Sequence, residues 1–176
     1  MMKYFAFAIA LYGFTACTEA PKEKEKNEPQ KAEEPALEER EQAVFVNDQL
    51  SLAQAHAFVL TDSLLRIGDL DSMASFISEV QLEIVAVHHR VDEIESGLEY
   101  AEEFKQAVLQ QLDYIENGLK NEIPKMISIS KSGKKELADQ MYFDWIKGYQ
   151  ERSQEILAAQ IKFTEKHRVK IDPVGE

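Results

Sequence analysis

The sequence has few of the residues that build disulfide-rich, turn-rich or nucleic-acid-binding proteins. Its 176 residues include one cysteine, seven glycines and five prolines. One cysteine excludes an internal disulfide framework and any zinc site made of several cysteines, and so few glycines and prolines argue against a turn-rich β-sandwich. Basic residues are also scarce, 20 against 32 acidic ones, which gives a net charge of −12. Since a nucleic-acid-binding surface needs a basic footprint, we expect no nucleic-acid partner.

The one continuous hydrophobic stretch is at the N-terminus. It covers residues 4–14, follows Lys3, and is succeeded by the small residues Thr15 and Ala16. A basic start, an apolar run and small residues before a processing point are typical of a secretory signal peptide. A helix over residues 4–16 would span about 20 Å, which is short of a hydrocarbon core of roughly 30 Å. We therefore expect a signal peptide over residues 1–16 and no transmembrane anchor.

The only cysteine directly follows this stretch. The run Phe14-Thr15-Ala16-Cys17 resembles the lipobox of bacterial lipoproteins, with Phe14 where leucine is usual. The resemblance covers the first seventeen residues and implies that Cys17 is acylated, with palmitate among its lipids, and becomes the first residue of the mature chain. It implies an anchor in the bacterial cell envelope. In enterobacteria an aspartate after the cysteine favours the inner membrane, so Thr18 favours the outer membrane, facing the periplasm or the cell surface. An ordinary signal peptide followed by a chance cysteine is the alternative.

Residues 17–41 resemble a tether in composition. After Cys17 the segment has nine acidic and five basic residues, three prolines and a single large apolar residue, Leu37. Such a segment cannot bury enough apolar surface to offset its ordering entropy, so we expect disorder. An acidic chain gains nothing from anionic lipid headgroups. Attachment to the membrane would therefore depend on the lipid on Cys17.

Residues 42–172 form the expected domain, because their apolar residues recur at helical spacing. The pattern predicts helices over 42–67, 72–120 and 134–169. The apolar faces of the first and third helices are Leu50, Ala53, Ala57, Leu60, Leu64 and Ile67, and then Leu137, Met141, Trp145, Tyr149, Ile156, Ala159 and Phe163. The second face runs through Met73, Ile77, Val80, Ile84, Val87, Val91, Ile94, Leu98, Ala101, Val108, Leu112, Ile115 and Leu119.

Residues 72–120 keep one heptad phase across Ser96-Gly97, apart from a miss at Lys105. A hairpin would have no reason to preserve that phase, and one glycine costs only about 1 kcal/mol in a helix. The pattern therefore favours an all-α, elongated antiparallel three-helix bundle with coiled-coil spacing and one long central helix of about 73 Å. If the chain breaks near Gly97, the alternative is a four-helix up-down bundle.

Catalytic and metal-binding motifs are absent from the sequence, so we expect no enzyme activity and no cofactor. The phosphate-binding glycine loop, the G-x-S-x-G elbow, the HExxH zinc motif and the inward Glu-x-x-His pairs of di-iron bundles are all missing. The best metal candidates are weak. His88 with Asp92 and His89 with Glu93 are i,i+4 pairs, which we interpret first as exposed histidines with local carboxylate partners.

Two groups are candidates for partner binding. Tyr142, Trp145 and Tyr149 share one helix face and suit an interface anchor, with core packing as the alternative. We expect residues 121–133 to form a loop or a short helical turn, with Ile123, Met126, Ile127 and Ile129 as packing residues. Lysines gather around this segment, and exposure of Met126 and Ile127 beside them is the alternative. These lysines are Lys120, Lys125, Lys131, Lys134 and Lys135. They suit a headgroup, glycan or acidic partner, or they simply solubilise a helix end.

These features favour a lipid-anchored envelope lipoprotein whose helical domain binds or spaces another envelope protein without catalysis. One alternative is an immunity- or inhibitor-type protein, whose acidic surface would attract a basic toxin or enzyme. Another is a metal- or ligand-binding helical sensor that uses His88 and His89. The oligomeric state stays open.

Overall fold

A computed structural model describes residues 37–67 and 70–170 of the chain. The predicted signal peptide, Cys17 and the tether up to residue 36 lie outside the described residues. The part of the chain that the structure describes contains helices and no strand. The predicted all-α class is therefore confirmed.

Helices account for almost all of the described chain. They are α1 (Leu37–Leu65), α2 (Leu70–Asp92), α3 (Ala101–Asn117), the π-helical turn η1 (Gly118–Glu122), α4 (Ile123–Lys131) and α5 (Lys135–His167). Helix α1 begins five residues earlier than the sequence predicts, inside the expected tether. Helix α5 matches its predicted range of 134–169 to within two residues. Because α3, η1 and α4 follow one another without a break, they act as one helical run.

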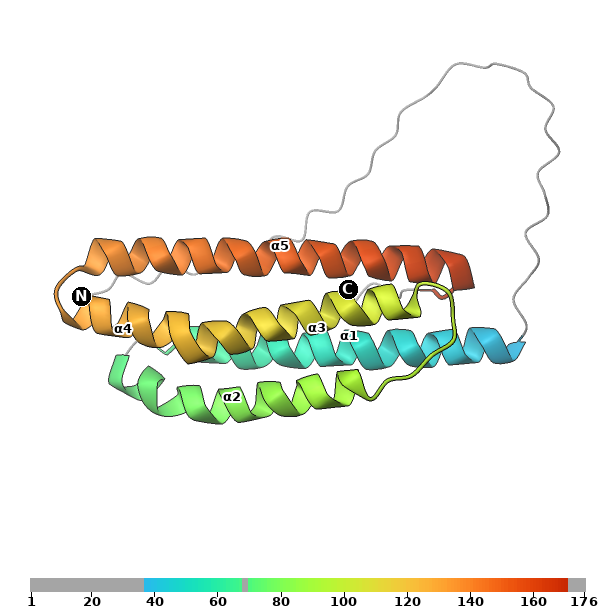
Figure 1. Cartoon of the computed structure of the whole chain (residues 1–176), viewed down its shortest axis with the longest axis horizontal. Helices are drawn as coiled ribbons and strands as arrows, with labels where there is room; N and C mark the ends of the chain where they lie inside the picture. The colour runs from blue at the N-terminus through green and yellow to red at the C-terminus, as the bar shows by residue number, and fades with distance from the viewer. Residues whose placement is uncertain (1–36, 68–69, 171–176) are drawn as a thin grey trace, which may run out of the picture. The chain divides into compact units, whose positions relative to one another are not determined.

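The helices pack with their neighbours in chain order and alternate in direction (Figure 1). Helix α1 packs on α2, α2 on α3, and α5 along α3 and α4. Helix α1 also reaches α3 across the bundle, so a single core lies between them. The largest side chains that are fully buried there are apolar, and burial of each contributes about 1.5–3 kcal/mol. They include Leu50, Leu64, Ile84, Phe104, Leu112, Ile115, Leu119, Ile156 and Phe163.

The continuous helix predicted over residues 72–120 is not present. Helix α2 ends at Asp92 and α3 begins at Ala101, with a non-helical connection between them. Gly97 lies in this connection, but its backbone needs no glycine, since a Cβ there would meet nothing within 4 Å. The left-handed backbone is at Tyr100, with φ at 65°. The apolar residues before and after the break share a heptad phase only by coincidence, because no continuous helix joins α2 to α3.

Lys105, the one miss in the apolar stripe, explains how α2 ends. Its ammonium donates to the carbonyl oxygens of Asp92 at 2.6 Å and Ile94 at 3.1 Å, which satisfies acceptors that a helix end leaves without partners. The core position goes instead to the neighbouring Phe104, which is fully buried and packs its ring 6.0 Å from that of Phe163. The apparent miss is thus a side chain that binds the end of α2 instead of entering the core.

Helix α5 holds the connection from the other side. Lys166 pairs with Glu99 at 2.6 Å, and Lys162 pairs with Glu103 while its ammonium lies 4.1 Å from the centre of the Tyr100 ring. The ion pair lowers the pKa of Glu99 and raises that of Lys166. These contacts join residues about 60 positions apart. They favour the chain reversal over a continuous helix, and no local pattern reveals them.

The segment over residues 121–133, predicted as a loop or a short helical turn, is mostly helical. η1 and α4 carry the helical run to Lys131, and only residues 132–134 form a turn, with φ at 85° at Gly133. Met126 and Ile127 are packing residues rather than exposed ones, since they are 8% and 7% exposed where α4 packs on α5. One core prediction on α5 is wrong. Leu137 is 49% exposed and Ala138 is buried in its place.

Candidate functional site

The predicted aromatic face on α5 belongs mainly to the core. Trp145 is only 4% exposed. Its ring stacks on the rings of Tyr114 and Tyr149, with centroid distances of 6.0 Å and 6.2 Å. The Tyr114 hydroxyl donates a 2.8 Å hydrogen bond to the Trp145 carbonyl oxygen. Burial raises the pKa of the Tyr149 hydroxyl to about 12. Among the three predicted anchors, Tyr142 is exposed, at 37%, Tyr149 is half-buried and Trp145 is buried.

Two glycines make this aromatic packing possible. A Cβ on Gly118 would lie 2.2 Å from Trp145 Nε1, and a Cβ on Gly148 would lie 2.2 Å from the Tyr114 hydroxyl. Gly118 also opens the π-helical turn η1, so the chain widens where the indole approaches its backbone. The indole N–H has no hydrogen-bond partner among the described residues. π-Helical turns are often found at functional sites, but the space beside this one is filled by Trp145.

The predicted lysine group does reach the surface. Lys125, Lys131, Lys134 and Lys135 are exposed, at the end of the bundle where α4 turns into α5 (Figure 1). The neighbouring Met126 and Ile127 are buried. The structure therefore offers a cationic patch there without an exposed apolar centre.

His88 and His89, the weak metal candidates, contact different carboxylates. His88 Nε2 lies 3.0 Å from an Asp113 oxygen on α3 rather than near Asp92. His89 Nδ1 lies 3.3 Å from Glu93 on the exposed side of α2, and the Asp92 carboxylate lies 3.9 Å from Lys105. Among the described residues, no group of three or more His, Cys, Asp or Glu side chains could hold a metal ion.

Sequence reasoning did not single out the buried histidine, His167. It is 1% exposed at the C-terminal end of α5. Its Nδ1 lies 3.0 Å from a Glu39 carboxylate oxygen and its Nε2 lies 2.9 Å from the Glu99 carbonyl oxygen. The ring ties α5 to α1 and to the connection after α2, which gives it a structural role.

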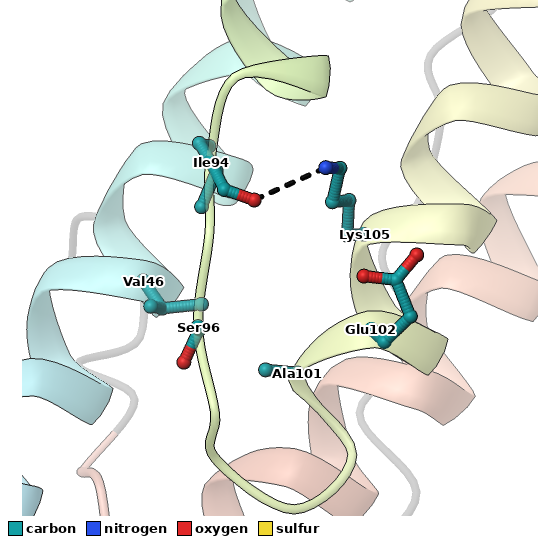
Figure 2. A pocket seen from close by; sticks show the side chains of 6 residues that line it. All are labelled: Val46, Ile94, Ser96, Ala101, Glu102 and Lys105. Atoms are coloured by element: carbon teal, nitrogen blue, oxygen red, sulfur yellow. Dashed lines mark hydrogen bonds between the residues drawn. The ribbon is translucent and has the colours of Figure 1, made fainter.

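A small pocket lies between α1, the connection and α3 (Figure 2). It is too narrow to hold a water molecule. Figure 2 shows Lys105 on one side, with its ammonium bonded to the Ile94 carbonyl oxygen, and Val46 of α1 on the other. The pocket is a packing seam around the end of α2 and offers no room for a ligand.

Exposed apolar side chains, rather than a pocket, distinguish the surface. The large ones lie on α1, α2 and α5, and among the described residues none lies on α3, η1 or α4. Those on α1 and α5 are Leu37, Val44, Phe45, Leu52, Phe58, Val59, Leu137, Tyr142, Phe143, Leu157 and Ile161. Exposed apolar side chains that recur along one helix are candidates for a protein-interaction surface. Binding is the chemistry that this arrangement supports.

Comparison with known proteins adds no family to this description. No protein-family model, curated protein or solved structure matches the chain. Within the described residues, none of the helices has the length and hydrophobicity needed to cross a membrane.

Proposed function

We propose that this chain is a lipid-anchored lipoprotein of the bacterial cell envelope, whose helical unit binds or spaces a partner protein without catalysis. The observation that supports binding is the set of large apolar side chains exposed on α1 and α5. The anchor rests on the lipobox-like run that ends at Cys17 and on the tether-like composition after it. Thr18 after the cysteine favours the outer membrane. We classify the helical unit as a four-helix up-down bundle, with α3, η1 and α4 as its third helix.

The lipid anchor is tested by replacing its one acceptor. In the Cys17→Ala variant, acylation is impossible, so the protein should move from the membrane fraction to the soluble fraction of the envelope. Mass spectrometry of the mature wild-type protein should find acyl chains on its N-terminal cysteine. Retention of the Cys17→Ala variant in membranes would overturn this part of the proposal.

The binding function is tested by crosslinking the full chain in the native envelope and identifying the proteins joined to it. A specific envelope partner is expected. An inhibitor of a basic toxin or enzyme is the second candidate, supported by the net charge of −12, since opposite charge accelerates association. Loss of the partner's own activity on binding would support the inhibitor, and a partner whose activity is unchanged would support a scaffold.

A further inference from the structure

Helix α1 has an apolar face that the rest of the bundle does not cover. We call it the α1 outer face, defined by Phe45, Leu52 and Val59, which repeat one heptad apart and are 59%, 64% and 57% exposed. The opposite side of the same helix supplies core residues such as Leu50 and Leu64. A helix that is apolar on several sides is normally buried on several sides. The α1 outer face spans about 21 Å at 1.5 Å per residue, which suits the i, i+7 anchors of a helix that packs along it.

A column of carboxylates runs beside this face. Glu41 and Asp48 stand one heptad apart, and Asp62 follows two heptads later, with Ala55 at the position between. Glu41 and Asp48 lie four residues before Phe45 and Leu52, so each of these two acids neighbours an anchor on the helix surface. Asp62 is bridged by Arg66 at 2.6 Å. Among the described residues, neither Glu41 nor Asp48 forms an ion pair, and the Asp48 carboxylate accepts a 3.3 Å hydrogen bond from the Asn47 side-chain amide. Helix α1 itself has no lysine and a single arginine, Arg40.

We infer that the α1 outer face binds an amphipathic helix of a partner protein, and that lysine or arginine flanks the apolar stripe of that helix. The inference rests on the binding function proposed above and specifies the chemistry of the partner. Apolar anchors would supply the buried contact. Charged columns beside such a seam select the partner, and the carboxylates of Glu41 and Asp48 lose hydration on docking unless cations meet them. A basic flank meets both carboxylates and leaves none unpaired.

The same acidic column disfavours the two other occupants of an exposed apolar helix face. In a parallel pair of α1 helices from two copies, the acidic columns would approach each other. In an antiparallel pair, Asp48 and its equivalents would lie against apolar anchors and lose water without a partner. An anionic bilayer surface repels the carboxylates as well.

Site-specific photocrosslinking in the native envelope tests the inference. The full chain carries p-benzoylphenylalanine in place of Leu52, or of Val59 as a second site. Leu82, on α2 and 72% exposed, is the matched control site, and Tyr142 probes α5. Mass spectrometry identifies the crosslinked segment. We expect positions 52 and 59, but not 82, to crosslink to a segment with apolar residues at helical spacing and flanking lysine or arginine.

A synthetic peptide with the sequence of the crosslinked segment then measures the charge contribution. The peptide is titrated into the full chain carrying Cys17→Ala, which keeps it in solution. The double change Glu41→Gln with Asp48→Asn should weaken binding at least about tenfold, equivalent to about 1.4 kcal/mol, and should flatten its salt dependence. Glu136→Gln, at an exposed site on α5, is the control and should leave binding unchanged.

Several outcomes would overturn the inference. Crosslinks from positions 52 and 59 to another copy of this chain, to lipid, or to an acidic or neutral segment each name a different occupant. Crosslinking from positions 52 and 59 that is no stronger than from position 82 would mean that the α1 outer face binds no partner. Crosslinking to a protein from position 142 alone would overturn this inference while supporting the binding function, and crosslinks from none of the sites would count against both.

Discussion

The substitution Gly118→Ala should destabilise the protein, although alanine normally favours a helix over glycine. The new Cβ would lie 2.2, 2.7 and 2.9 Å from three atoms of the Trp145 indole. Because non-bonded heavy atoms pack best at about 3.5–4.0 Å, the indole and backbone must separate by more than about 1 Å. Trp145 has little room to move, since Tyr114 and Tyr149 stack on it. Overpacking of this kind costs about 3 kcal/mol, and the helix preference of alanine returns about 1 kcal/mol.

A net loss of about 2 kcal/mol should therefore appear in urea unfolding, with a fall in Tm of about 6–10 °C. Trp145 is the only tryptophan in the chain, so its fluorescence reports the same site and should shift to longer wavelength. Gly97→Ala is the matched control, because its Cβ would meet nothing within 4 Å and its stability should change by less than about 0.5 kcal/mol. If Gly118→Ala were as stable as the wild type with unchanged emission, the packing argument would be refuted.

Three further changes test other contacts. Lys105→Met removes the donor to two carbonyl oxygens at the end of α2 and should cost about 1–3 kcal/mol, with faster proteolysis within residues 93–100; resistance equal to wild type would contradict this role. His167→Ala removes two hydrogen bonds and leaves the partly exposed Glu39 carboxylate without its buried partner, so thermal unfolding should show a loss of about 2–4 kcal/mol; a loss below about 0.5 kcal/mol would refute it. Gln111→Met combined with Ser153→Ala removes a part-buried side-chain hydrogen bond of 2.8 Å, together with the Gln111 oxygen that has no partner among the described residues. The free energy of unfolding in urea should therefore stay within about 1 kcal/mol of the wild-type value or rise. A larger loss would mean that the pair stabilises the core.

Much of the helical architecture follows from local spacing. The apolar stripe over Leu50, Ala57 and Leu64 predicts the buried side of α1, and each of the three is fully buried. Helix α5 lies within two residues of its predicted range. Helical periodicity is a property of neighbouring residues, so a sequence reveals it without knowledge of the partner helix. The site is less predictable. Tryptophan is a residue type that is common among interface anchors, so the sequence suggests that role for Trp145. Only its packing against the Gly118 backbone shows that it is buried.

The sequence by itself determined the all-helical class, the core faces, the acidic surface and the lipobox resemblance at Cys17, because each depends on residue type or short-range spacing. The tertiary structure alone decided that the chain reverses between Asp92 and Ala101. The contacts at that reversal come from Lys105, and from Lys162 and Lys166 about 60 residues further along the chain, so the local heptad phase could not reveal them. The structure also decided which apolar residues lack cover. Phe45 and Leu50 look alike in sequence, and only the positions of the other helices place one on the surface and the other in the core.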